Sequence, residues 1–411
     1  PTTAILSFYT ITNDTYLFVL RQDGVKVHTY RGLGLKELQS WIWEKWFESY
    51  LSSREEWQQQ MPEFLQDVGR KLKLEELCKS DLQDIEELIL IPHRHLHFLP
   101  WSAMPVAESG DNKYLGDRFR IRTLASCQIL DFCTQREEIQ GEVKQGIVED
   151  THNDLPCSSY EAQYIAQMYG VPEEQRLRGE AATIDSYKLL LSQVQRLLST
   201  HHAQSRIDNC MESALVLADG RLTLGQLLSP AFRFPDLDEV FIDCCETNLG
   251  QVQISDDVLT LNTGFLCAGA RGVISSLWSV DDLGTCLFSI FYHQLRQEGK
   301  NRSLALQLGQ RQLRELTGKE LKKKYKKELE EALDEKLEAA YKQLQEIERR
   351  LDSYAEGSAE YQELKEEREK LVAIYERIFD TKNKYLKAAC KKQHPFEHPA
   401  YWSGFICAGL S

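Results

Sequence analysis

Short apolar runs alternate with helical patterns through the middle of the chain, and this alternation constrains the fold more than any other feature. Helices are expected at 160–168, 183–192, 224–228 and 258–268, and strands at 194–200, 239–243 and 272–278. Strands that alternate with helices form parallel sheets with helices on both faces. The sequence therefore predicts an α/β fold with a mostly parallel sheet, whose functional side chains gather where the strands end.

The N-terminal part has a different pattern. Residues 3–30 form short β-rich runs separated by polar turns, which predicts an antiparallel meander. Helical spacing follows at 38–51 and 56–73, and a compact apolar strand is expected at 87–91. This part is therefore β-rich and helical.

Residues 318–393 are rich in Lys, Glu, Leu and Ala and contain no proline. The pattern breaks at Gly357, which predicts two helices of roughly 33 residues in an antiparallel hairpin about 50 Å long. An apolar seam marks each helix: Leu321, Tyr325, Leu329, Leu333, Leu337, Tyr341, Leu344 and Ile347 on the first, Tyr361, Leu364, Leu371, Ile374 and Ile378 on the second. The hairpin is either a solvated connection or a docking arm, and we expect it to fold semi-independently and contribute little to catalysis.

The charges are unevenly distributed. The segment 318–393 carries 19 Lys/Arg and 18 Asp/Glu, which leaves 30 and 45 for the rest of the chain. An acidic body argues against direct nucleic-acid binding, because phosphate contacts need clustered cations. The chain has no apolar run of 18 residues and no basic N-terminal region, so neither a membrane span nor secretion is expected. Its eleven cysteines lack a short-spaced framework, which fits a reducing, cytoplasmic location.

Cysteine and histidine residues follow two of the predicted strands. The sequence Asp-Cys-Cys-Glu-Thr-Asn-Leu-Gly, residues 243–250, comes after the apolar run 240–242, and His201 and His202 come after the strand at 194–200. A histidine at the end of a neighbouring parallel strand can activate a thiol. The two motifs together indicate a cysteine hydrolase.

Several blocks of the sequence resemble the CHAT domain family of caspase-like (clan CD) cysteine proteases, which is related to caspases, metacaspases and separase. These blocks are 88–103 (LILIPHRHLHFLPWSA), 114–117 (YLGD), 213–223 (SALVLADGRLT), 245–247 (CET), 276–282 (SLWSVDD) and 398–402 (HPAYW). They occur in the family's order and cover the chain apart from one long insertion. The resemblance implies a pseudo-caspase-like half at 1–140, a catalytic caspase-like half at 141–317, an inserted coiled-coil hairpin at 318–393 and a completing strand at 394–411.

The resemblance implies Cys245 as the nucleophile and His202 as its general base, with His201 as the alternative base. Adjacent strand residues point to opposite faces, so only one of Cys244 and Cys245 can face the cleft, and Cys244 is expected to be a packing residue. The family histidine is normally followed by glycine, whereas Ala203 stands here. The backbone N–H groups of Ala203 and Cys245 are the expected oxyanion donors.

The resemblance also implies an acidic S1 pocket for Arg or Lys, built from Asp243, Asp281 and Asp282. Carboxylates at these positions can pair with a guanidinium. The alternative is that Asp243 caps the following turn and that Asp281 and Asp282 cap a helix.

Three histidines, His93, His95 and His97, would share one face of an extended segment and superficially resemble a metal cluster. The matching family block has histidines at the first and last of these positions and no metal. The Cys and His pairs also lack the spacing of zinc sites. Neither a metal nor a cofactor is expected.

The leading interpretation is a cytoplasmic cysteine endopeptidase that cuts a protein partner after a basic residue in a regulatory or defence pathway. Family members often carry TPR repeats or sensor domains, and some act with CRISPR effector complexes, so a regulatory protein or a TPR/sensor module is an expected partner. One alternative is a catalytically silent scaffold that recruits partners through the helical arm. Another is a small-molecule thiol hydrolase or acyltransferase, which would need an enclosed apolar pocket.

Overall fold

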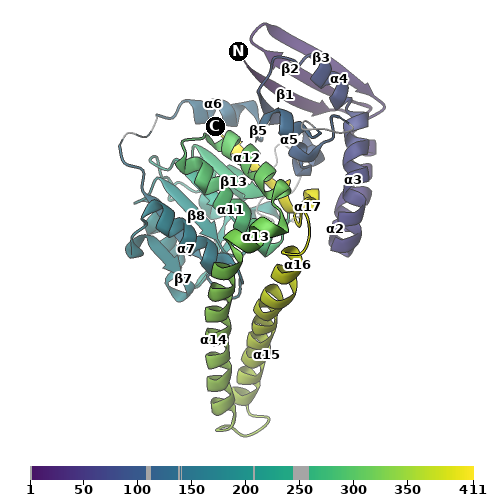
Figure 1. The fold of residues 1–411 in the computed structure, drawn as a ribbon. Helices are drawn as coiled ribbons and strands as arrows, with labels where there is room; N and C mark the ends of the chain where they lie inside the picture. Colours follow the sequence, from purple (N-terminus) through teal and green to yellow (C-terminus); the bar gives the residue numbers. More distant parts are fainter. Residues whose placement is uncertain (1, 108–112, 138, 140, 207–208, 244–258) are drawn as a thin grey trace.

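The structure is a computed structural model that describes residues 2–107, 113–137, 139, 141–206, 209–243 and 259–411. These residues form a large sheet with the strand order β3-β2-β1-β4-β5-β14-β13-β12-β8-β6-β7 (Figure 1). Its strands are β1 (Thr3–Thr10), β2 (Asp14–Arg21), β3 (Gly24–Arg31), β4 (Glu87–Ile91), β5 (Arg120–Thr123), β6 (Gln145–Glu149), β7 (Arg176–Arg178), β8 (Arg196–Thr200), β12 (Glu239–Ile242), β13 (Gly272–Ser276) and β14 (Phe405–Gly409). Strands β1, β2 and β3 form the predicted antiparallel meander, and most of the other pairs are parallel, so the predicted α/β class is confirmed.

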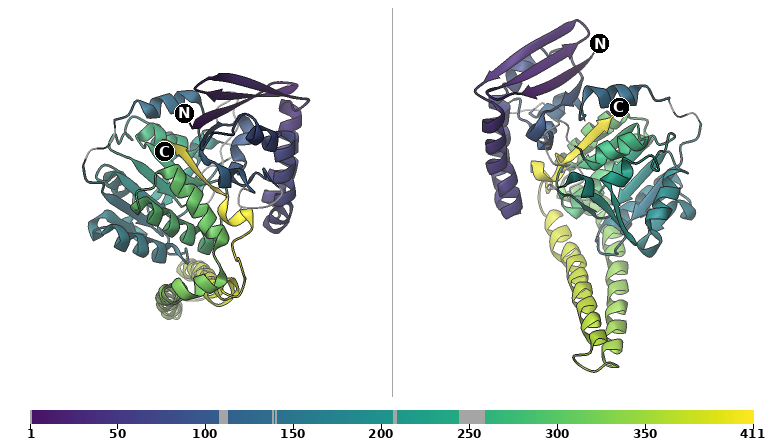
Figure 2. Two further views of the ribbon diagram at one scale, coloured as in Figure 1. Left: turned by 45° about the horizontal axis from the view of Figure 1, so that its top comes forward. Right: turned by 180° about the vertical axis from the view of Figure 1, so that it is seen from behind.

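The last strand of the chain lies in the middle of the sheet and joins its two halves. β14 pairs with β13 in antiparallel fashion and with β5 in parallel fashion. In Figure 2 the yellow arrow of β14 lies among the strands of the body, between the N-terminal part and the later strands. A buried ion pair between Arg122 of β5 and Glu87 of β4 (3.0 Å) lies beside it, and Arg122 also donates to the carbonyl of Gly409 (2.9 Å). The two halves therefore share one continuous sheet.

Helices cover both faces of the sheet, and strand alternation decides which strand residue meets which layer. Leu198 of β8 and Phe241 of β12 pack into the core beneath α7, α11 and α12, whereas Leu197 and Val240 pack into the core beneath α8, α9 and α10. The helices of the body are α1 (Leu35–Ile42), α2 (Glu48–Ser52), α3 (Arg54–Lys71), α4 (Leu74–Lys79), α5 (Leu115–Arg118), α6 (Cys127–Thr134), α7 (Ser158–Tyr169), α8 (Ile184–Leu191), α9 (Leu224–Leu227), α10 (Leu261–Ala268), α11 (Asp282–Gln297) and α12 (Arg302–Glu315). The layer with α7, α11 and α12 faces the viewer in Figure 1.

The histidine-rich segment is not extended as predicted. Residues Arg94–Phe98 form a 3-10 turn, which His93 precedes in an extended conformation. All three histidines are buried, and burial lowers the pKa of His95 to about 4 and that of His97 to about 3. A turn has no alternating faces, so the expectation of a shared face was wrong. Across the residues that the structure describes, no group of three His, Cys, Asp or Glu side chains is arranged to hold a metal ion.

The segment 318–393 forms a helical arm that projects from the body (Figures 1 and 2). Its helices are α13 (Gly318–Lys324), α14 (Lys326–Leu351), α15 (Ala359–Asp380) and α16 (Lys387–Ala389), and α17 (Pro399–Trp402) leads to β14. α14 has 26 residues and α15 has 22, so both are shorter than the roughly 33 predicted. On the first side of the hairpin the difference arises because the helix is interrupted at Tyr325, whose backbone is not helical. On the second side α15 continues through a π-helical segment at Thr381–Leu386 into α16, so the helical run extends to Ala389.

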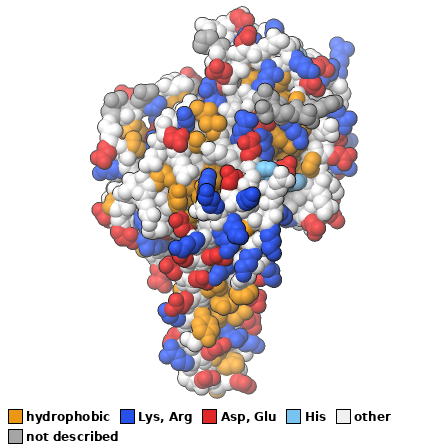
Figure 3. Space-filling model, viewed as in Figure 1, with side chains coloured by type: hydrophobic (Ala, Val, Ile, Leu, Met, Phe, Trp, Pro, Cys, Tyr) orange, Lys and Arg blue, Asp and Glu red, His pale blue; other side chains and the backbone are white. Residues whose placement is uncertain are grey.

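The base of the arm belongs to the core of the body. Leu321, Leu329 and Leu333 are fully buried in the same apolar cluster as α7 and α11, and the Tyr325 ring meets Phe291 of α11 edge to face at 6.0 Å. This packing differs from the expectation that the hairpin folds semi-independently of the body. The surface near the junction is also rich in Lys and Arg side chains (Figure 3).

Candidate active site

Three loops leave the same edge of the sheet, where β6, β8 and β12 end. β8 pairs in parallel with β6 on one side and with β12 on the other, so the carboxyl ends of these strands lie together. The loop after β6 carries Asp154, the end of β8 leads to His202, and β12 is followed by Asp243. Side chains that are distant in sequence therefore meet at this edge.

His202 is held by a carboxylate. Its Nε2 lies 2.7 Å from Oδ1 of Asp154, and both side chains are partly exposed. The hydrogen bond that His202 donates to Asp154 raises the pKa of His202, although burial opposes the shift. Burial acts to raise the pKa of Asp154, but the hydrogen bond and charge of His202 outweigh it and lower that pKa. Such a pair fixes the ring orientation and stabilises the imidazolium, and it leaves Nδ1 for a second partner.

The neighbouring histidine has a different environment. His201 is buried, its Nε2 lies 2.8 Å from Oγ of Ser199, and its Nδ1 lies 3.0 Å from the carbonyl oxygen of His202. Burial lowers the pKa of His201 to about 4. Strand alternation explains the contrast, because Ser199 and His201 share the face that α8 covers, where Tyr187 lies. Of the two candidates, His202 is the accessible one.

Ala203 begins β9 (Ala203–Gln204), the edge strand of a small sheet that also contains β10 (Ala214–Leu217) and β11 (Gly220–Thr223). Ala203 is the residue opposite Leu215, and the N–H of Val216 donates to the carbonyl of His202 at 2.9 Å. This bonding pattern makes Ala203 and Leu215 a non-hydrogen-bonded pair, so the N–H of Ala203 points away from β10. That orientation is compatible with an oxyanion donor.

The expected nucleophile Cys245 and its neighbour Cys244 lie outside the residues that the structure describes. Asp243 is the last described residue before them.

Acidic side chains gather beneath this edge on the α7 face. Burial, followed by the charge of Asp282, raises the pKa of Asp243 to about 7, while a hydrogen bond with Glu161 of α7 opposes the shift. Burial and the charge of Asp243 also raise the pKa of Glu161, whose Oε2 accepts a hydrogen bond from Thr200 at 3.0 Å. We call Glu161, Asp243 and Asp282 the acidic cluster. The raised pKa values mean that the cluster holds protons, which a bound cation would displace.

The three predicted S1 residues have different roles in the structure. Asp282 accepts a hydrogen bond from the backbone N–H of Cys157 at 2.8 Å and acts electrostatically on Asp243. Asp281 is exposed and caps α11 by accepting from the N–H of Gly284 at 2.9 Å, as the alternative interpretation predicted. Asp243 and Asp282 thus lie close together, whereas Asp281 caps a helix.

Sequence reasoning missed two residues of this site, Asp154 and Glu161. The signal for Glu161 was its helical spacing, four residues from both Cys157 and Ile165 on a buried face of α7. A charged residue at such a position is costly to bury and is often functional. Asp154 offered no comparable signal, because the four-residue loop between it and β6 can direct its side chain in many ways.

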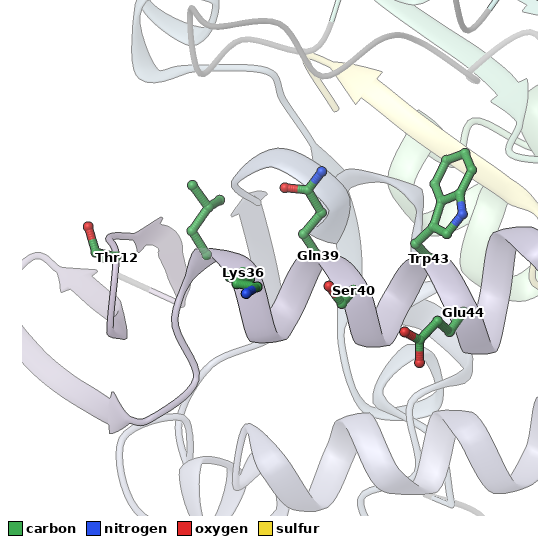
Figure 4. A pocket seen from close by; sticks show the side chains of 7 residues that line it. Thr12, Lys36, Gln39, Ser40, Trp43 and Glu44 are labelled. Carbon is green, nitrogen blue, oxygen red and sulfur yellow. The ribbon is translucent and has the colours of Figure 1, made fainter.

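A separate hollow of about 510 Å³ lies on the N-terminal half, along α1 (Figure 4). It is lined by Thr12, Leu35, Lys36, Gln39, Ser40, Trp43 and Glu44. This lining includes neither cysteine nor histidine, so it lacks the groups of a thiol-based site.

The comparisons with known proteins agree with this architecture. The CHAT domain profile matches residues 62–410, which is most of the chain. The protein therefore belongs to the CHAT domain family, whose fold is that of the caspase-like cysteine proteases of clan CD. No curated protein matches the sequence.

Two kinds of protease structure are similar to this fold. Separase from Saccharomyces cerevisiae, in its complex with securin, aligns with a TM-score of 0.52 and 12% identity over 75% of this chain and 29% of the separase chain. The Arg-specific cysteine proteinase gingipain R of Porphyromonas gingivalis aligns with a TM-score of 0.42 and 9% identity over 60% of this chain and 62% of its own. The chain thus spans less than two thirds of either relative. Among the described helices, none is long and apolar enough to cross a membrane.

Replacing Asp154 by asparagine should lower the pKa of His202, because the hydrogen-bonded carboxylate is the main cause of its elevation. NMR titration of the histidine ring protons would measure this change. Asp219→Asn, which alters a carboxylate that accepts from the N–H of Ile184, serves as the control and should leave His202 unchanged. An unchanged or higher pKa in Asp154→Asn would contradict the assignment.

Proposed function

We propose that this chain is a cysteine endopeptidase in which His202 is the general base for Cys245. The observation that carries the proposal is the 2.7 Å contact between Asp154 and His202, at the end of the strand adjacent to the one that leads to Cys245. A silent scaffold would have no need of a carboxylate that holds an accessible imidazole. This contact therefore favours an enzyme over a scaffold.

In the proposed reaction, His202 accepts the proton of the Cys245 thiol, and the thiolate attacks the carbonyl carbon of the scissile bond. The backbone N–H groups of Ala203 and Cys245 stabilise the oxyanion of the tetrahedral intermediate. The imidazolium then gives its proton to the leaving amine as the peptide bond breaks. Water, deprotonated by His202, hydrolyses the acyl-enzyme and restores the thiol. Asp154 stabilises the imidazolium at each stage.

The substrate we propose is a protein cleaved after Arg or Lys. Asp243 and Asp282 are the S1 carboxylates in this proposal, and Glu161 supports them through its contact with Asp243. Asp281 remains at the edge of the pocket as the cap of α11. Mass spectrometry of the cleavage sites in a proteome-derived peptide library tests both the activity and the preference. Absence of cleavage would contradict the endopeptidase, and Asp or a large apolar residue at P1 would contradict the acidic S1 pocket.

The affinity for basic substrates should increase as the pH rises through about 7. Above this value Asp243 is deprotonated and attracts a guanidinium, whereas below it the carboxyl is neutral and the attraction is lost. Binding of a cation should also release a proton, which calorimetry in buffers of different ionisation enthalpy can detect. Asp243→Asn should remove both effects and lower kcat/KM for an Arg substrate about tenfold or more.

Asp281→Asn is the matched control for that experiment, because the carboxylate of Asp281 caps α11 by accepting from the N–H of Gly284. It should retain the proton release. A KM that does not depend on pH between 6 and 8 in the unmodified protein would remove Asp243 from the pocket.

The biological setting that we propose is regulated proteolysis in the cytoplasm, in a regulatory or defence pathway that includes CRISPR-associated systems. A TPR or sensor module, or another regulatory protein, would control the activity. The distal arm offers a surface for such a partner, because Tyr341 and Tyr354 are exposed there.

A further inference from the structure

The helical arm contacts the loop that orients His202. Lys336 of α14 donates to Oδ2 of Asp150 and to the carbonyl of Leu155. Nη1 of Arg377, on α15, donates to the carbonyl of Asp154 at 3.3 Å and lies 3.8 Å from its Oδ2. Each long helix of the arm thus supplies one cation to the loop 150–155.

The conformation of loop 150–155 depends on the Asp150 side chain, which Lys336 contacts. Asp150 accepts the backbone N–H groups of Asp154 (2.9 Å) and Leu155 (3.1 Å) through Oδ1, while its other oxygen receives Lys336. Asp150 and Asn153 have φ values of 40° and 57°, in the left-handed region that Asp and Asn adopt more readily than other residues with a side chain. The turn therefore depends on the local hydrogen bonds of Asp150, the same side chain that Lys336 contacts.

The two cations differ in how strongly they interact with the loop. Lys336 and Asp150 are 15% and 4% exposed, so solvent screens their interaction weakly. Arg377 is about half-exposed, so its own contribution is the smaller of the two. Removing Lys336 would leave the buried Asp150 carboxylate without its cation. Because an unpaired buried charge is costly, we expect the loop to rearrange so that this carboxylate reaches solvent.

We propose that Lys336 and Arg377 are positioning residues that hold Asp154 against His202, so that the helical arm sets the orientation of the general base. A partner that moves the arm would thereby change the activity. The proposal deepens the endopeptidase function and rests on it for its catalytic consequence, but the contact with His202 can be measured separately. It replaces the expectation that the arm contributes little to catalysis.

The pKa of His202 distinguishes positioning from a simple charge effect. The groups that act on this ring are Asp150, His152 and Asp154 of the loop, His201 beside it, and Arg377 of the arm. Asp154 raises the pKa of His202, and the positive charge of Arg377 lowers it. If the cations act only through their charge, their removal raises the pKa. If they position Asp154, their removal lowers the pKa toward that of Asp154→Asn.

The test uses the full chain carrying Lys336→Met and Arg377→Met together, with histidine NMR titration and peptide kinetics. We expect the pKa of His202 to fall and kcat to drop about tenfold or more with little change in KM, because small displacements of a catalytic group are costly. The conservative pair Lys336→Arg and Arg377→Lys should restore both quantities. The control pair Lys342→Met and Arg368→Met, at exposed ion pairs of the same two helices, should change neither.

An unchanged thermal unfolding temperature in the double variant would show that its fold is intact. If the double variant is destabilised, the comparison of the conservative pair with the unmodified protein still tests the proposal. A pKa of His202 that rises or stays the same overturns the proposal. A fall in this pKa supports the positioning role even if no peptide is cleaved, a result that would contradict only the endopeptidase function. Peptide cleavage that is unchanged in the double variant likewise overturns the proposal and leaves the endopeptidase intact.

Discussion

Replacing Cys245 by alanine is expected to abolish peptide cleavage and to leave the fold unchanged. The proposed mechanism has no step that another group can take over, because the thiolate forms the covalent acyl-enzyme. Rates of peptide hydrolysis, measured at saturating substrate, would show the loss, and thermal unfolding would show that the protein is still folded. Labelling with a thiol-directed peptide probe should disappear from the peptide that contains residue 245.

The matched control is Cys244→Ala, which changes the adjacent thiol by the same atoms. It should keep the activity, because in an extended segment adjacent side chains face opposite sides and only one of the two thiols can enter the site. Loss of activity in Cys244→Ala, with activity kept in Cys245→Ala, would show that the assignment of the nucleophile is wrong by one residue.

Replacing His202 by alanine should lower kcat by roughly 10² to 10⁴, the usual contribution of a general base. The thiol would then depend on solvent for deprotonation, and the leaving amine would lack its proton donor. His201→Ala is the control, since His201 is buried against Ser199 and Tyr187. Its loss should lower the unfolding temperature more than the kcat of the folded protein.

The two histidine variants therefore separate catalysis from stability. If His201→Ala loses activity while remaining folded, and His202→Ala retains it, the base has been assigned to the wrong residue.

The local pattern of the chain was sufficient to predict most of the secondary structure around the site. The strand at 194–200 and the helix at 160–168 correspond to β8 and α7, and the meander at 3–30 corresponds to β1, β2 and β3. Apolar periodicity reports which residues are buried, and turn residues mark where elements end. The histidine segment at 93–97 failed because alternation in the sequence was taken for an extended strand, whereas the backbone turns.

The arm shows where such patterns become ambiguous. Its seam at Leu321, Leu329 and Leu333 predicted burial correctly, but an apolar residue does not specify what will cover it. The body covers these three residues, and the arm helices cover Ala340 and Ile347 farther out. The position of the arm against loop 150–155 follows from that packing.

The amino-acid sequence by itself determined the class of fold, the alternation of strands and helices, and the family. Each of these can be predicted from local patterns within short segments. Only the tertiary structure decided that Asp154 meets His202, that Glu161 joins Asp243 beneath the sheet edge, and that Lys336 reaches Asp150. Each of these contacts joins segments 48 to 186 residues apart. Their formation depends on strand order, on the placement of β14 between the two halves and on helix packing, and these are properties of the whole chain that no short segment contains.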